Sequence, residues 1–186
     1  MNLGLTGSFL IGGILLITIL TVHMNVREDA TTTTLQITAM TNATTVAEIA
    51  DNDFPNIGVG NGMTSLLSAS ATGITFLSDI DGDFTIDTLT WHFDSTSADT
   101  ATPNPNDHRL LRIVNSDTLK FSSNVTAFDL TYFDDFGSIT ANLDSIRRIR
   151  VRVLCESPAQ FGTEFQSSAW QRTYVPINLA PLIGGV

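Results

Sequence analysis

The chain has 186 residues, of which 19 are acidic and 9 are Lys or Arg, so its formal net charge is -10 at pH 7. A field of this sign repels a phosphate backbone, which excludes nucleic acid as an expected partner. The length allows one head domain of ordinary size beside an apolar segment. The single cysteine, Cys155, excludes an intrachain disulfide, and its position after an apolar strand is typical of a small buried hydrophobe.

The first 26 residues form the most apolar segment of the chain. Residues 3–22 carry no charged side chain, and the segment ends at Arg27-Glu28-Asp29. Twenty such residues, at about 1.5 Å each in a helix, cross the hydrocarbon core of a bilayer. We do not expect a cleaved secretory signal, because such signals have a shorter apolar core, preceding basic residues and a small-residue cleavage site. We predict a membrane-inserting helix over residues 1–26.

Small side chains recur along this apolar segment. Helices that associate in apolar surroundings need such residues for close approach, whereas glycine weakens an isolated helix. The segment is therefore expected to lie in the membrane first and to pack against its own copies later. The residues expected to carry this assembly are Gly4, Gly7, Phe9, Gly12, Gly13, Leu16 and Leu20.

Residues 27–53 are expected to continue the helix. Residues 29–52 contain neither Gly nor Pro, and apolar side chains from Leu35 to Ala50 recur at helical spacing. The many threonines between residues 31 and 45 lower helix propensity, so this part must depend on packing. Pro55 disfavours helical geometry in the residue before it, so residues 53–60 are expected to end the rod and to act as a hinge to the head.

Residues 54–186 are expected to form a β-rich head domain. From Thr72 onward the apolar pattern has a period of two, which indicates strands. The expected strands are 74–80, 86–93, 110–114, 119–121, 125–133, 146–154 and 174–179. Asp81-Gly82-Asp83 is typical of a turn between the first two of these strands. Short strands separated by polar turns predict an α+β fold in which the long helix packs on an antiparallel sheet.

The order of these features resembles that of the type IV pilin and pseudopilin superfamily, with a head most similar to those of minor pilin-like proteins. The resemblance is carried by the uncharged helix and its continuation, the break at 53–60, the Ile-Thr-Phe-Leu-Ser-Asp-Ile-Asp-Gly-Asp hairpin at 74–83, and the strands at 125–133 and 146–153. It implies a subunit of an extracellular filament or secretion pseudopilus, held in the inner membrane before assembly into a helical homo-oligomer at the cell surface. The glutamate usual early in the helix of that family has no counterpart before Glu28. Under this resemblance the chain would be either a minor tip subunit or a subunit of a divergent filament.

Four carboxylates in the first hairpin form a candidate calcium site. Asp79, Asp81, Asp83 and Asp87 occupy positions one, three, five and nine of a potential loop, and Ca²⁺ binds several oxygens at once. The glycine stands at the fourth position rather than the sixth, and Thr90 replaces the closing glutamate of an EF-hand. Asp-Gly is also ordinary turn chemistry, so a turn without metal is the principal alternative. No other cofactor is expected.

Three arginines alternate with apolar residues in the expected strand 146–154. Arg148, Arg150 and Arg152 therefore share one face of that strand. This face would either contact an acidic neighbour in a filament or pair with carboxylates of the same chain, for which the candidates are Asp129, Asp134 and Asp135.

Motifs of catalysis are absent from the sequence. His23, His92 and His108 occur in no zinc-binding pattern, and neither a nucleophile elbow nor a phosphate-binding glycine loop is present. We therefore expect a structural protein rather than an enzyme. The main alternative is a single-pass membrane protein whose outer domain binds calcium or another ligand.

Overall fold

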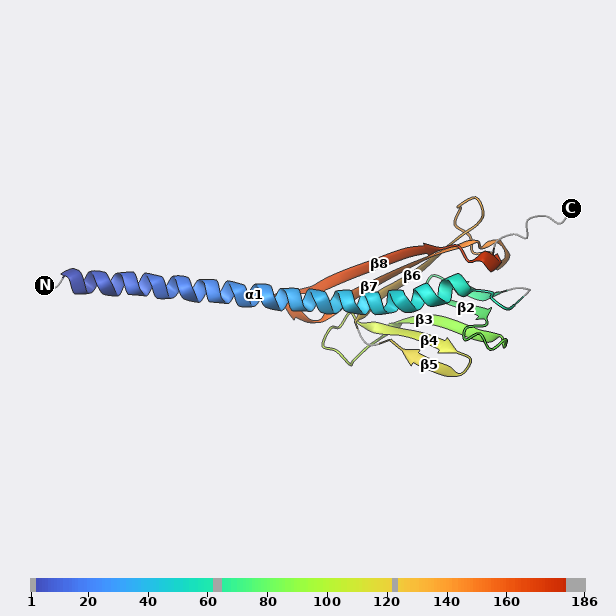
Figure 1. Cartoon of the computed structure of the whole chain (residues 1–186), viewed down its shortest axis with the longest axis horizontal. Helices are drawn as coiled ribbons and strands as arrows, with labels where there is room; N and C mark the ends of the chain where they lie inside the picture. Colours follow the sequence, from blue (N-terminus) through green and yellow to red (C-terminus); the bar gives the residue numbers. More distant parts are fainter. Residues whose placement is uncertain (1–2, 62–64, 122–123, 180–186) are drawn as a thin grey trace.

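The computed structural model describes residues 3–61, 65–121 and 124–179. One long helix, α1 (Leu3–Asp53), lies against an eight-stranded antiparallel sheet (Figure 1). This architecture confirms the α+β class that the sequence predicts. Residues 1 and 2 of the expected apolar segment and residues 180–186 of the expected head lie outside the described residues.

The helix contains 51 residues, which corresponds to a length of about 75 Å. Its projecting half, residues 4–30, extends beyond the head, and its packed half, residues 31–53, lies on the sheet (Figure 1). The helix ends at Asp53, as predicted, and a single 3-10 turn, Phe54–Asn56, follows. Pro55 lies in this turn, where its missing amide hydrogen leaves no helical bond unmade.

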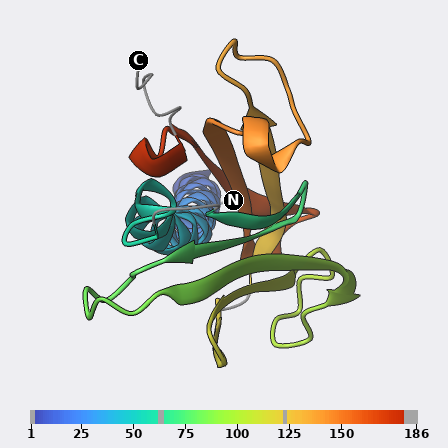
Figure 2. The ribbon, with the colours of Figure 1, turned by 90° about the vertical axis from the view of Figure 1, so that its right-hand side faces the viewer.

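The eight strands form a sheet with two arms, β1–β5 and β6–β8. They are β1 (Leu66–Ser70), β2 (Gly73–Ser78), β3 (Asp87–Ala98), β4 (His108–Val114), β5 (Asp117–Lys120), β6 (Val125–Phe133), β7 (Arg148–Phe161) and β8 (Glu164–Tyr174). The order across the sheet is β1-β2-β3-β4-β6-β7-β8, and β5 pairs with β4. Among the described residues, β4 and β6 pair through His108 and Val125 alone. The sheet therefore bends at this joint, and α1 lies in the angle between the two arms (Figure 2).

Small side chains on one face of the packed half allow α1 to approach the sheet closely. The buried residues of this face follow helical spacing: Ala39, Ala43, Val46, Ala47 and Ala50. Aromatic side chains from both arms fill the space beneath them. The Trp91 ring of β3 stacks on Phe128 of β6 with centroids 5.7 Å apart, so the core crosses the joint between the arms.

The strands differ from the sequence prediction in three places. β1 and β8 were not expected, and the strand expected at 174–179 is wrong, because Tyr174 is the last residue of β8 and Ile177–Leu179 is a 3-10 turn. Pro176 lacks the amide hydrogen that a continued strand needs, and its carbonyl instead accepts the Leu179 amide at 3.1 Å. The strand expected at 125–133 is confirmed with the same ends as β6, and the other expected strands and the β2–β3 hairpin are confirmed with shifted ends.

The segment 53–60, where the sequence predicts a hinge, packs as a corner between α1 and the head. Asp53, Phe54 and Ile57 are fully buried. The amide of Gly58 donates to the carbonyl of Leu77 at 2.9 Å, which binds the corner to the end of β2. Gly58 also has a φ of 80°, and a side chain there would overlap Ser65. Burial and hydrogen bonding therefore hold the helix end in one position on the head.

Candidate functional site

The projecting half of α1 exposes a continuous apolar surface. None of its described side chains is buried, and Phe9 is 75% exposed. Among the described residues, α1 is long and apolar enough to cross a membrane. An apolar surface of this extent needs cover from lipid or protein. Its large exposed side chains are Phe9, Leu10, Ile11, Ile14, Leu15, Leu16, Ile17, Ile19, Leu20, Val22, Met24 and Val26.

The residues expected to carry assembly all lie on this half, but on two sides of it. Phe9, Gly13, Leu16 and Leu20 follow the spacing of one helix face, and Gly12 flanks them. Gly4 and Gly7 lie on the opposite side. A Cβ added at any of the four glycines would have nothing within 4 Å. Glycine costs about 1 kcal/mol in a helix relative to alanine. The chain itself does not fill the space that these glycines leave, so a neighbouring helix can occupy it.

Hydroxyl groups in the projecting half are satisfied by their own helix. The side chains of Ser8, Thr18 and Thr21 each donate to the carbonyl four residues earlier, at 2.9 Å. An unpaired hydroxyl would be costly to move out of water. These bonds remove that cost, so the segment suits a bilayer or a helix bundle in spite of its polar residues.

Two carboxylates in the last turn of α1 bind the helix to both arms of the sheet. Asp53 is fully buried and accepts from Trp91 Nε1 at 2.9 Å, while Nε and Nη2 of Arg112 donate to its two oxygens at 2.6 and 2.9 Å. Asp51 accepts from Arg172 at 2.7 Å and from the Tyr174 hydroxyl at 2.6 Å. Burial, reinforced by this bond to Asp51, raises the pKa of Tyr174, so its hydroxyl remains a donor.

These anchoring residues were not predicted from the sequence. A signal was present, because negative charge is unfavourable at a helix C-terminus and needs cations close by. Their identity was not readable, since Trp91 and Arg112 lie 38 and 59 residues away along the chain.

The acidic hairpin between β2 and β3 brings together three of the four expected metal ligands. Asp79, Asp81 and Asp87 offer carboxylate oxygens that lie within 4.8 Å of one another. Asp83 is not in this group, and its Oδ1 accepts the Thr85 amide at 2.7 Å. Asp79 also accepts the amides of Gly82 and Phe84. The hydrogen bonds of the loop fit a turn that needs no metal, and its three convergent carboxylates fit a calcium site. Calcium binding therefore stays a prediction.

The expected arginine row lies on the outer face of β7. Arg152 Nη1 is 3.6 Å from Asp129 Oδ2, and the Arg148 guanidinium donates to the Asp135 carbonyl at 3.4 Å. The Arg150 guanidinium lies 4.7 Å above the Phe133 ring centre. Of the carboxylates considered for intrachain pairing with this row, Asp129 pairs, while Asp134 accepts amides of its own loop.

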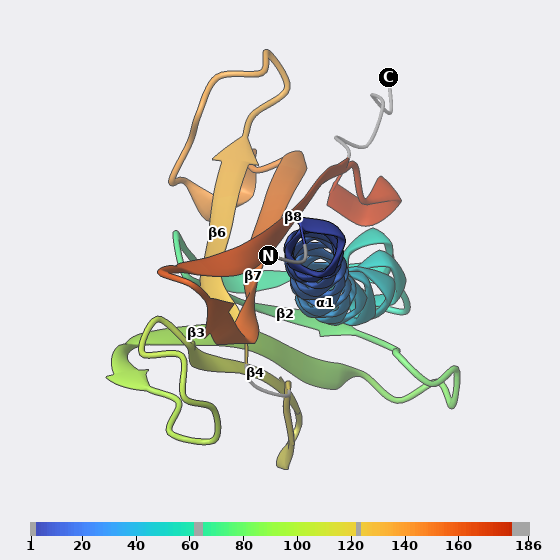
Figure 3. The same ribbon diagram turned by 90° about the vertical axis from the view of Figure 1, so that its left-hand side faces the viewer.

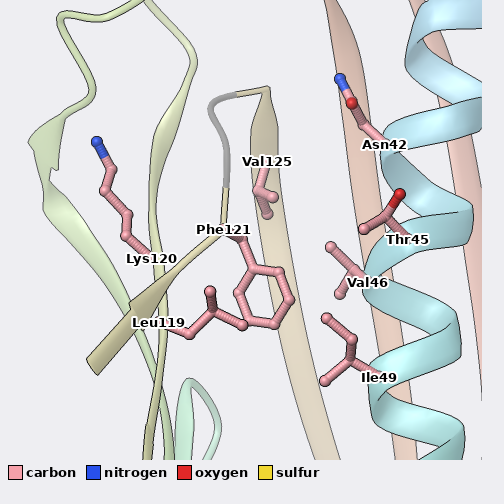
Figure 4. Close-up of a pocket in the computed structure, with 8 residues that line it drawn as sticks. All are labelled: Asn42, Thr45, Val46, Ile49, Leu119, Lys120, Phe121 and Val125. Carbon is pink, nitrogen blue, oxygen red and sulfur yellow. The ribbon is translucent and has the colours of Figure 1, made fainter. Parts of the chain in front are cut away.

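A small apolar pocket of about 130 Å³ lies between α1 and the chain around β5 (Figure 4). Val46, Ile49 and Phe121 line it, and the Lys120 amine points away from it (Figure 4). That amine pairs with Asp99 Oδ2 at 2.8 Å. The polar groups around the pocket are therefore at its rim and engaged elsewhere, which leaves no arrangement for acid, base or nucleophilic chemistry.

Cys155 is buried, as predicted from the sequence. Burial is the main cause that raises the pKa of its thiol to about 12, with the nearby Asp107 carboxylate adding to it. A thiol with this pKa stays protonated at neutral pH and is a poor nucleophile.

Asp107 is a buried carboxylate with one unpartnered oxygen. It is fully buried, its Oδ2 accepts from the Thr102 hydroxyl, and its Oδ1 has no hydrogen-bond partner. Burial raises the pKa of Asp107, and the negative charges of Glu156 and Asp99 raise it further. The group lies next to the joint between the arms, since Asn124 Nδ2 approaches it at 3.4 Å.

Comparison with protein-family models, with curated proteins and with solved structures gives no match for this chain. The long apolar helix on an antiparallel sheet is compatible with a pilin-like fold.

Proposed function

We propose that the chain is a non-enzymatic structural subunit of an extracellular, pilus-like filament or pseudopilus, which polymerises through the projecting half of α1. Before assembly the helix lies in the membrane with the head outside, and on assembly it leaves the lipid and packs against the helices of other copies. The observation that carries this proposal is the row of large apolar side chains from Phe9 to Val26, all of which are exposed in the described chain.

The glycines favour a helix bundle over a permanent place in lipid. A lone membrane anchor gains nothing from glycine, whereas packed helices gain close backbone contact. Gly13 lies on the same helix face as Phe9, Leu16 and Leu20, and Gly12 flanks it, so small and large residues share this surface. Such a surface suits interlocking helices better than the uniform chains of a bilayer.

The alternative is a single-pass membrane protein whose head binds calcium or another ligand. The convergence of Asp79, Asp81 and Asp87 is the observation that favours it. Calorimetric titration of the detergent-solubilised full chain with Ca²⁺ tests it, with Asp79→Asn and Asp87→Asn in one variant as the control. If the native chain shows no calcium-dependent heat, calcium is excluded as its ligand.

Assembly is tested on the full chain expressed in cells. Filaments sheared from the cells should sediment without detergent and show helical order by electron microscopy. Gly13→Leu should abolish them, because a large side chain separates the packed helices, while its higher helix propensity and hydrophobicity keep the subunit in the membrane fraction. Ile11→Leu, which conserves volume, is the matched control and should assemble normally. Native chain that stays in the membrane until detergent is added would contradict the proposal.

A further inference from the structure

The arginine row, Arg148, Arg150 and Arg152, is a cationic strip on a strongly acidic molecule. Among the described residues, Arg152 has a carboxylate within 4.0 Å, and Arg148 and Arg150 have none. All three side chains are exposed on the outer face of β7. The strip therefore keeps positive charge that is available to an anionic surface.

The acidic hairpin is its electrostatic opposite. Asp79, Asp81, Asp83 and Asp87 have no Lys or Arg within 4.0 Å among the described residues. Phe84 stands at its tip with 96% of its surface exposed. Its φ of 67° is a left-handed conformation that an aromatic residue rarely adopts. The hairpin thus holds a large apolar side chain in water, beside carboxylates, at a cost in free energy.

These two surfaces cannot meet within one chain. The outer face of β6 and β7 and the β2–β3 loop lie on opposite sides of α1 (Figure 3). A contact between them must join two copies through different surfaces. Such heterologous contacts generate open helical assemblies unless the rotation closes a ring. An open helical assembly is also the form of the proposed filament.

We propose that the acidic hairpin of one subunit docks on the arginine row of a second copy, so that charge pairing between heads fixes the arrangement that the stalks stabilise. This inference rests on the proposed filament. Carboxylates of Asp81 and Asp83 pair with guanidinium groups, and Phe84 packs on the apolar surface that Phe133 and the Arg150 stem provide. Phe84 is the aromatic anchor and the charges give the register.

Cross-linking in assembled filaments tests the contact directly. Asp83→Cys and Arg150→Cys are combined in one full-length chain, and filaments are treated with a short bis-maleimide. A ladder of covalent multimers is expected on a denaturing gel. Either single variant should give no ladder, because the second thiol is missing, and Cys155 is too deeply buried to react.

Charge reversal gives an independent readout. Arg150→Glu with Arg152→Glu should lower the amount of sedimentable filament roughly tenfold, since like charges then face each other. Asp81→Lys with Asp83→Lys on the same chain should restore it. Arg109→Glu, an exposed arginine on β4, is the matched control and should assemble normally.

The results separate this inference from the filament proposal. Ordered filaments of the double-cysteine chain without a ladder would overturn the docking of heads and leave polymerisation by α1 standing. No filament from the native chain would overturn both. A ladder together with rescue by the second charge reversal supports both.

Discussion

The two halves of α1 are one continuous helix, yet their apolar side chains have opposite surroundings. In the packed half the buried positions are mostly alanine, and the sheet covers them. In the projecting half the large apolar side chains from Phe9 to Val26 are each more than half exposed in the described chain. Large side chains without cover cost free energy in water. The difference shows that the head covers the apolar side chains of the packed half, and that lipid or other copies must cover those of the projecting half.

The largest expected effect is in the packed half. Asp53→Ala removes the partner of the Arg112 guanidinium, whose side chain is 15% exposed, and of the Trp91 indole. An uncompensated charge of this kind should cost about 3–5 kcal/mol of unfolding free energy. Urea denaturation of the solubilised full chain, followed by tryptophan fluorescence, measures it. Asp29→Ala, on the projecting half, is the control and should change stability by less than about 0.5 kcal/mol.

If the Asp53→Ala head does not fold at all, Asp53→Asn gives a measurable intermediate. The amide keeps the size of the side chain and can still accept one hydrogen bond. Equal denaturation curves for the Asp53 and Asp29 variants would show that the buried pair does not anchor the helix.

The packed half should also resist larger side chains. Ala50 is fully buried against the sheet, so Ala50→Leu should force the helix away and cost about 2 kcal/mol. Ala30→Leu makes the same chemical change at an exposed position of the projecting half. It should be neutral within about 0.5 kcal/mol. Similar losses for both variants would mean that the two halves do not differ in packing as the structure describes.

The sequence predicted those parts of the molecule whose signals are local. Pro55 marks the end of α1 because its ring acts on its immediate neighbours. The alternation from Ile74 to Phe93 predicts β2 and β3, because each strand buries one face. β8 carries a weaker signal. Tyr174 is its one buried side chain, and its other large apolar residues, Phe165 and Trp170, lie on opposite faces among polar and small neighbours.

The site was predictable to a similar extent. The exposed stalk and its glycines could be read directly, because hydrophobicity and residue size are properties of single residues. The convergence of Asp79, Asp81 and Asp87 without Asp83 could not, because left-handed backbone at Gly82 and Phe84 redirects the loop between them. The residues that bind Asp53 lie in strands 38 and 59 residues farther along the sequence, so local spacing gave no information about them.

The joint between the arms, on which the packed half rests, should gain stability when Asp107 loses its charge. Asp107→Asn removes a buried carboxylate whose Oδ1 has no partner, and should raise the unfolding free energy by about 1 kcal/mol at pH 7. Asp117→Asn, an exposed acid on β5, is the control. Lower stability of the Asp107→Asn chain at pH 7 would show that the carboxylate is well accommodated.

The sign of the pH dependence follows from the raised pKa of Asp107. The folded chain binds the proton more tightly than the unfolded chain, in which the ordinary value is 3.8. The carboxyl group is therefore stabilising below that value, and its contribution is lost as the pH rises through the folded pKa. The advantage of Asp107→Asn should be largest at neutral pH and shrink in acid, as thermal denaturation at several pH values can measure.

The smallest expected effect on the unfolding free energy is at the ion pair of Asp51, which lies two residues before Asp53, the site of the largest effect. Its ion pair with Arg172 is short, at 2.7 Å, but the side chains are 37% and 57% exposed. Water screens such a pair, so Arg172→Met should cost about 0.5 kcal/mol, and the Tyr174 hydroxyl still binds Asp51. High salt should erase the difference between the native and variant chains, whereas the loss from Asp53→Ala should persist. Since both aspartates bind arginine from the same turn of α1, an equal salt response would mean that burial is not what separates them.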